Sequence, residues 1–195
     1  PREFLKGFTG VVVCDGYSAY RKLDRETEAI VFAGCWTHAR RYFADALKAL
    51  PKKEHEAARD TVAYEAIKRI GAIYHLDNQL AGLKPDDRRK QRQINLKPLV
   101  EAFFAWVKEI QISGRLSKGK TLEGINYCIN QEEALKVFLD DGEVPLDNNA
   151  TEGALRSFCL HKHAWKLNDS IAGAKSSAIV YSITETAQAN HLNPL

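Results

Sequence analysis

Two acidic motifs lie far apart in this chain, and their residue types suggest metal chemistry. VVVCDGYSAY (11–20) places Asp15 directly after a β-branched run, and VPLDNNATEGALR (144–156) places Glu152 in the first turn of a predicted helix. Carboxylates at a strand end and a helix start can share a divalent ion such as Mg²⁺, which prefers oxygen ligands. Two such ions can activate a nucleophile and stabilise the leaving oxygen of an in-line displacement. This is the chemistry of enzymes that cut phosphodiesters.

Each carboxylate also has a purely structural interpretation. Asp15-Gly16 is a strong turn signal, and spacing alone favours the turn. If Asn149 is an N-cap, Glu152 falls at the third helical position and completes a capping box. Asp147 is a turn residue or an outer-shell group. The structural and chemical interpretations are compatible, because a helix N-terminus favours negative charge.

The elements that must position these acids begin with a predicted β-α-β unit. Residues 11–14 form a short strand, 17–23 a short helix and 29–34 a second strand. The connection is about as short as a right-handed parallel crossover allows. Two parallel strands are marginal alone, so either helices cover them or further strands lie outside this sequence.

The rest of the chain has helical periodicity, with a polar, highly charged stretch at 83–93 that is either a loop or a solvated helix start, and a basic loop at 114–120. The helices are predicted over about 36–50, 54–76, 97–111, 121–129, 131–140 and, with an apolar stripe of Ile179, Val180 and Ile183, 173–190.

Composition fits a globular protein of one domain, or a core with an insertion. The chain has 195 residues, of which 45% are hydrophobic and 27% charged, and its net charge of +3 is compatible with nucleic acid. No apolar stretch approaches the length of a membrane helix. Four scattered cysteines favour reduced thiols in a cytosolic protein. The absence of Met, with Pro at position 1, indicates a piece of a longer or processed protein.

Five ordered motifs resemble the transposases of the insertion sequence 66 family, over nearly the whole chain from about residue 8. They are CDGYSAY, GCWTHARRYF, SKGKTLEGINYCINQ, LDDGEVPLDNNATEGALR and AGAKSSAIVYSITETAQAN. The resemblance implies an α/β, mostly helical chain: a partial ribonuclease H-like fold (residues 1–35 and 141–195) with a large helical insertion (36–140). It also implies an Asp-Asp-Glu metal triad, in which Asp15 resembles the second acid and Glu152 the third.

The chain departs from the family pattern in three places. Nothing in residues 1–14 can supply the first Asp, Gly153 stands where the family usually has Arg, and Ser157 stands where it tends to have Pro. We therefore expect a catalytically incomplete chain, which need not hold a metal by itself.

Basic residues are the better candidates for binding DNA, because phosphate contacts supply most sequence-independent affinity. The run Arg88, Arg89, Lys90 and Arg92 is more typical of a solvated face. Trp36 and Trp165 suit stacking on unpaired bases or a core. Cys35, His38, Cys159, His161 and His163 offer zinc ligands, although their spacing is not that of a standard finger, and His38 is alternatively a proton-transfer group beside the carboxylates. The DNA-binding candidates are Arg40, Arg41, Arg115, Lys118, Lys120, Arg156, Lys162 and Lys166.

The leading hypothesis is part of a bacterial, cytoplasmic, nucleoid-associated DNA transposase. Its parent would bind element ends and target DNA as a homo-oligomer, with Mg²⁺ or Mn²⁺ held by Asp15 and Glu152. Water would attack a phosphodiester, and the freed 3′ hydroxyl would attack target DNA. The alternatives are a catalytically inactive DNA-binding or oligomerisation remnant, and a nuclease of the same fold that does not join strands.

Overall fold

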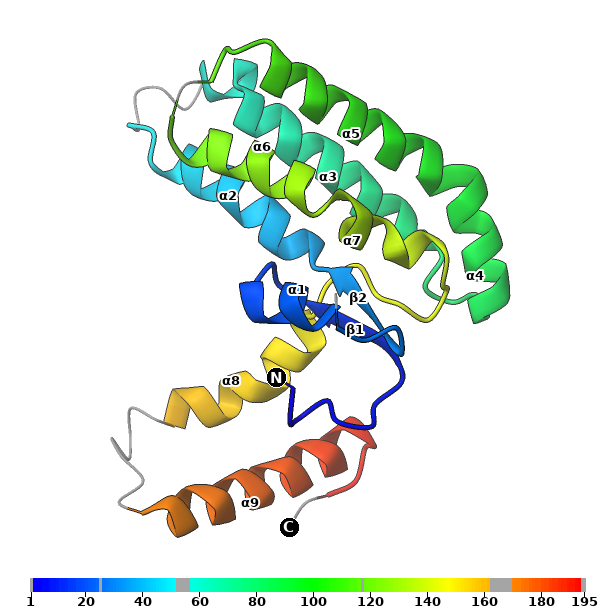
Figure 1. Cartoon of the computed structure of the whole chain (residues 1–195), viewed down its shortest axis with the longest axis vertical. Coiled ribbons are helices and arrows are strands. Elements are labelled where there is room, and N and C mark those ends of the chain that lie inside the picture. Colours follow the sequence, from blue (N-terminus) through cyan, green and yellow to red (C-terminus); the bar gives the residue numbers. More distant parts are fainter. Residues whose placement is uncertain (1, 25, 52–56, 117, 162–169, 194–195) are drawn as a thin grey trace. The chain divides into compact units, whose positions relative to one another are not determined.

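The computed structural model describes residues 2–24, 26–51, 57–116, 118–161 and 170–193. Contacts divide the chain into two compact units, Pro1–Asn148 and Asn149–Leu195, and each is described by itself (Figure 1). Among the described residues, no helix is both long and apolar enough to cross a membrane.

The first unit begins with the predicted β-α-β arrangement. β1 (Gly10–Cys14) and β2 (Ile30–Gly34) pair in parallel, with Gly10 opposite Ile30 and Cys14 opposite Gly34, and α1 (Ser18–Asp24) connects them. Side chains alternate across the pleat, so the two faces have different partners. Cys14 and Phe32 pack with Leu23 of α1, whereas Ala33 packs into the core of the helical part.

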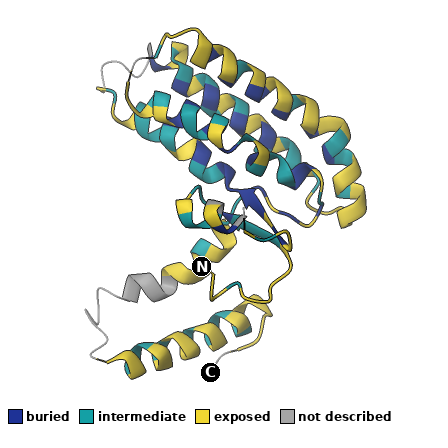
Figure 2. Cartoon of the chain, viewed as in Figure 1, coloured by how far each residue is buried: buried dark blue, intermediate teal, exposed yellow. Residues whose placement is uncertain are grey.

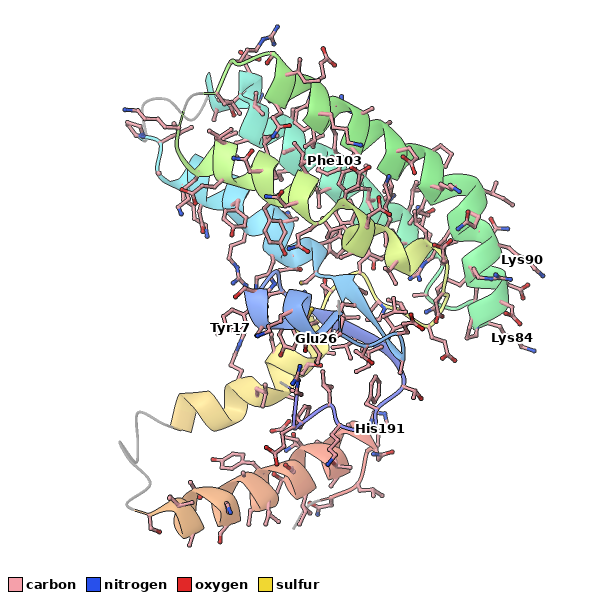
Figure 3. All side chains as sticks on the ribbon, viewed as in Figure 1. Tyr17, Glu26, Lys84, Lys90, Phe103 and His191 are labelled. Atoms are coloured by element: carbon pink, nitrogen blue, oxygen red, sulfur yellow. The ribbon has the colours of Figure 1, made fainter. Side chains whose placement is uncertain are left out.

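A helical bundle follows the strands and contains most of the buried side chains. Figure 2 shows dark blue, buried stretches along the helices of this bundle. Trp36, Phe43, Ile70, Phe103 and Ile125 are at most 1% exposed, and Figure 3 labels Phe103 inside the bundle. The elements are α2 (Trp36–Lys48), the 3₁₀ turn η2 (Ala57–Asp60), α3 (Val62–Gln79), α4 (Pro85–Gln91), the π-helical turn η3 (Arg92–Leu96), α5 (Lys97–Ile112), α6 (Lys120–Asn130), α7 (Glu132–Lys136) and the 3₁₀ turn η4 (Val137–Leu139).

Local sequence explains where several helices begin. Thr61 caps α3 by accepting a hydrogen bond from the Tyr64 amide at 3.2 Å. Pro85 stands in the first turn of α4, where proline is tolerated, and two aspartates follow it. The predicted boundaries hold within a few residues for α2, α5 and α6. The polar stretch at 83–93 is a helix that continues through η3 into α5.

Arg92 is not part of a solvated face, contrary to the prediction for the basic run. Its side chain is 1% exposed and forms a bidentate pair with Asp77 at 2.7 and 3.1 Å. Its Nη1 also donates to the carbonyls of Phe138, Asp141 and Val144, each at 2.8 Å. Arg88 likewise donates to backbone carbonyls, including that of Gly142 at 3.1 Å. These two arginines fasten residues 138–144 to the bundle.

The remainder of the basic run does face solvent. Arg89 and Lys90 are exposed, and Figure 3 shows Lys84 and Lys90 projecting outward around α4. The segment 143–146, predicted as extended, consists of bends rather than a strand. Val144 and Leu146 nevertheless bury their side chains in the bundle core.

The second unit contains α8 (Asn149–His161) and α9 (Ile171–Ala189). Ser170 caps α9 by accepting a hydrogen bond from the Gly173 amide at 3.0 Å. The predicted apolar stripe of α9 is exposed, since Ile179, Val180 and Ile183 are each about 60% accessible.

Candidate active site beside Asp15

Asp15 lies at the carboxyl end of β1, where ligands bind in open α/β sheets. Its Oδ1 accepts a hydrogen bond from the Tyr17 amide at 3.1 Å, which makes the turn predicted from Asp15-Gly16. The carboxylate is half-buried and lines an open cavity of about 540 Å³. The structure therefore contains the turn and leaves the carboxylate beside a ligand-sized space.

Helix α6 forms one wall of this cavity. Gly16 lies so close to the C-terminal end of α6 that a Cβ at position 16 would be 2.7 Å from the Tyr127 ring and 2.8 Å from the side-chain amide nitrogen of Gln131. A larger residue at this point of the turn would have to displace the Tyr127 ring and the Gln131 amide. Burial, together with the nearby charges of Cys35, Tyr42 and Asp15, raises the pKa of Tyr127, so its hydroxyl stays protonated at neutral pH.

Helix α2 forms the neighbouring wall with His38 and Tyr42. Nη1 of Arg41 lies 3.5 Å from Nε2 of His38. His38 thus lines the same cavity as Asp15, and its role in proton transfer stays a prediction. Cys35, immediately before α2, is buried, and burial is the main cause of its raised pKa.

Asp147 belongs to a separate polar cluster on the bundle. Its Oδ2 accepts hydrogen bonds from the hydroxyls of Tyr74 at 2.8 Å and Thr37 at 3.1 Å. Burial is the largest cause of the raised pKa of Tyr74, and Asp147 raises it further. In the same region the Trp36 amide donates to the Leu146 carbonyl at 2.9 Å. These bonds fix the chain just before α8, so Asp147 acts as a fastening residue.

Glu152 lies in the first turn of α8, as the motif predicts. It belongs to the second unit and Asp15 to the first, so the convergence of the two acids stays a prediction. Within the described ranges, no group of three or more His, Cys, Asp or Glu side chains could hold a metal. Asp15 by itself contributes one hard oxygen ligand.

The predicted DNA-binding residues are exposed wherever their side chains are described. Lys120 forms an ion pair with Glu123 at 2.6 Å. Lys162 and Lys166 lie outside the described residues. Exposed residues of this set are Arg40 and Arg41 on α2, Arg115 and Lys118 in the loop before α6, Lys120 at the start of α6, and Arg156 on α8.

Two other predictions concern aromatic and zinc-ligating residues. Trp36 is a core residue: it is fully buried, contacts Phe103 and Phe104, and donates from Nε1 to the Leu135 carbonyl at 2.9 Å. It cannot stack on a base, and Trp165 lies outside the described residues. The zinc prediction needs His163 and the side chains of Cys159 and His161, and these also lie outside what the structure describes.

Sequence reasoning missed the α6 side of the cavity. Glu123, Asn126, Tyr127, Asn130 and Gln131 all line it. Their spacing of three and four residues places them on one helical face. That polar stripe within SKGKTLEGINYCINQ was the available signal.

Comparisons with known proteins agree along most of the chain. The model of the transposase IS66 family matches residues 1–176. The uncharacterized protein y4hP of Sinorhizobium fredii (strain NBRC 101917 / NGR234) is 34% identical over 202 residues, covering 100% of this chain and 36% of the relative. The uncharacterized protein y4qI of the same strain is 32% identical over 199 residues, covering 98% and 35%. The chain thus spans about a third of the length of these curated relatives. No solved structure matches it significantly.

Proposed function

The chain belongs to the IS66 family of transposases, and we propose that it forms part of the catalytic centre of a DNA transposase. In this proposal Asp15 and Glu152 are the metal-binding acids. The observation that carries it is the position of Asp15: a half-buried carboxylate at the carboxyl end of a parallel strand, beside an open cavity of about 540 Å³. Glu152, in the first turn of α8, is the second acid.

The residues present fit a divalent ion in their chemistry. Asp15 engages one carboxylate oxygen with the Tyr17 amide, and one or two carboxylates with several waters are the usual protein ligands of Mg²⁺. When bound, Mg²⁺ or Mn²⁺ would supply Lewis-acid activation of the nucleophile and stabilise the leaving oxygen. His38, on the wall of the same cavity, would accept or donate the proton of the reacting group.

The two-stranded sheet supports a larger ribonuclease H-like fold. In a parallel pair, successive residues direct their backbone groups to alternate sides. The Gly10 amide donates to Ala29, and the Cys14 carbonyl accepts from Cys35. The backbone N–H and C=O groups of Val11 and Val13 therefore point away from β2. We propose that a further strand pairs with this edge, that residues 1–35 and 141–195 form the catalytic part, and that 36–140 form the helical insertion.

DNA is the proposed partner, contacted through the exposed basic residues of α2, α6 and the loop between α5 and α6. Arg40, Arg41, Arg115 and Lys118 are exposed, which suits sequence-independent phosphate contacts. Element ends and target DNA would be bound by a homo-oligomer in the bacterial nucleoid. Strand transfer, rather than hydrolysis alone, would distinguish the longer transposase from a nuclease of the same fold.

A second function is a DNA-binding or oligomerisation module without catalysis. One observation favours it: Gly153 follows Glu152 at the position where the resemblance leads us to expect Arg. Such a module would bind DNA without depending on metal.

Isothermal calorimetry with Mg²⁺ and with Mn²⁺ tests the proposal on the full chain. We expect binding that both Asp15→Asn and Glu152→Gln abolish, because each removes one ligand charge. Glu143→Gln is the matched control, since Glu143 is exposed and lies away from both acids in sequence. Binding that neither substitution changes would show that the acids serve only as turn and helix start, and the non-catalytic function would stand.

A further inference from the structure

The cavity beside Asp15 is more elaborate than a metal site requires. Three tyrosines line it, Tyr17 from the turn, Tyr42 from α2 and Tyr127 from α6. Three side-chain amides also line it, from Asn126, Asn130 and Gln131. Aromatic rings are not among the ligands of Mg²⁺ or Ca²⁺, so the three tyrosines suit a different ligand.

The aromatic groups are arranged as a wall with one exposed ring near it. The Tyr42 and Tyr127 rings lie 5.2 Å apart with an interplanar angle of 39°. Tyr17 is 61% exposed, and Figure 3 marks it beside the start of α1. Its backbone amide, not its ring, makes the bond to Asp15. The ring is therefore available to a ligand without disturbing the turn.

The polar groups of the wall indicate a neutral ligand with hydrogen-bonding edges. Amides offer both donors and acceptors, as base edges do. The lining residues in the described part include Asp15 and Glu123 but no lysine or arginine, so the polar contacts that the cavity offers directly are mainly amides and hydroxyls. The Tyr127 hydroxyl is buried and has no hydrogen-bond partner among the described residues, which is uncommon in native structures.

We propose that this cavity binds an unpaired nucleobase of the DNA strand held at Asp15. The tyrosine rings stack on the base, and the amides of α6 contact its edge. The inference rests on the proposed function, because Asp15 places the cavity beside the strand to be cut. It gives the helical insertion a direct part in substrate binding: α6 supplies the wall, and Gly16 lets that wall touch the turn that carries Asp15.

The test compares two DNA duplexes that differ only in one unpaired thymine, with binding to the full chain followed by fluorescence anisotropy. Stacking is worth about 1–3 kcal/mol per base, so we expect roughly tenfold tighter binding of the duplex with the unpaired base. Tyr17→Ala and Asn130→Ala should remove this preference while leaving binding of the paired duplex unchanged. Both residues are exposed, so neither substitution threatens the fold.

Tyr64→Ala is the matched control, because Tyr64 is an exposed tyrosine on α3 outside the cavity. A photoreactive iodouracil in place of the unpaired thymine should crosslink to a cavity tyrosine, identified by mass spectrometry. Equal binding of both duplexes, with no effect of Tyr17→Ala, would overturn the inference and leave the proposed function intact. No binding of either duplex would overturn both.

Discussion

Replacing Arg92 with methionine should destabilise the first unit strongly. Its guanidinium is 1% exposed and makes five hydrogen bonds, two to Asp77 and three to backbone carbonyls. It also lies 5.1 Å from the centroid of the Phe138 ring. Methionine fills much of the volume but leaves Asp77, itself only 16% exposed, without its partner.

The magnitude follows from that geometry. Removing one partner of a buried ion pair costs about 3–5 kcal/mol, because the remaining charge is left desolvated. A domain has about 5–15 kcal/mol of total stability, so the loss is a large share. The carbonyls of Phe138, Asp141 and Val144 would lose their hydrogen bonds to Arg92. They belong to the segment that leads to Asp147, so this segment should become less ordered as well.

Urea unfolding measures the effect, with tryptophan fluorescence reporting on Trp36 and Trp106 of the bundle. Lys90→Met is the control, because Lys90 is exposed and its contact with Asp87 at 3.6 Å is worth little. We expect Arg92→Met to be about 3–5 kcal/mol less stable and the control to stay within about 0.5 kcal/mol of the parent.

A double-mutant cycle isolates the pair itself. Adding Asp77→Asn to Arg92→Met should cost much less than Asp77→Asn alone, since the carboxylate left behind is then neutralised. Strictly additive costs, or a loss in Arg92→Met no larger than in Lys90→Met, would refute the assignment of Arg92 as the fastening residue.

Three further predictions concern other parts of the first unit. Burial alone would raise the pKa of Glu132, but the hydrogen bonds and charges of Lys108 and Lys136 outweigh burial and lower this pKa below 4.5. The ionised Glu132 carboxylate therefore stabilises the fold above about pH 4.5, and this contribution is lost as the pH falls through the pKa of the folded state. Thermal melts from about pH 6 to about pH 3 should thus show a steeper loss for the parent than for Glu132→Gln, and parallel curves would contradict this. Gly142→Ala should lower stability by about 1–3 kcal/mol, because its Cβ would clash with a backbone carbonyl of α4. Gly71→Ala, with open space around it on α3, should raise stability by about 0.5–1 kcal/mol. Chemical denaturation in which Gly142→Ala is as stable as the unsubstituted chain would exclude the clash. Tyr74→Phe should cost about 1–3 kcal/mol by taking a hydrogen bond from Asp147, and an unchanged urea midpoint would show that the bond contributes nothing.

Local sequence patterns predicted most elements of the first unit. The β-branched run of β1 ends at Asp15-Gly16, and both the strand and the turn are present. Apolar spacing of three and four residues predicted α2 and α5, because each buries one face in the bundle. These patterns concern neighbours along the chain, so the sequence contains the information directly.

Charge runs and aromatic residues were harder to assign. The run at 88–92 is continuous in sequence, yet Arg89 and Lys90 face solvent while Arg92 is buried against Asp77. Helical periodicity turns successive side chains to different environments. The environment of each depends on which segment packs nearby, and residues 138–144 lie far away in the sequence.

The sequence by itself therefore determined the β-α-β start, the helical periodicity, the family and the candidate acids Asp15 and Glu152. Each of these follows from local pattern or from ordered motifs. Only the tertiary structure decided that Trp36 belongs to the core, that Arg92 fastens a distant segment, and that α6 forms the wall of the cavity beside Asp15. The physical reason is that burial and contact depend on residues brought together from distant parts of the chain, and periodicity shows which face of a helix is polar without showing what that face meets.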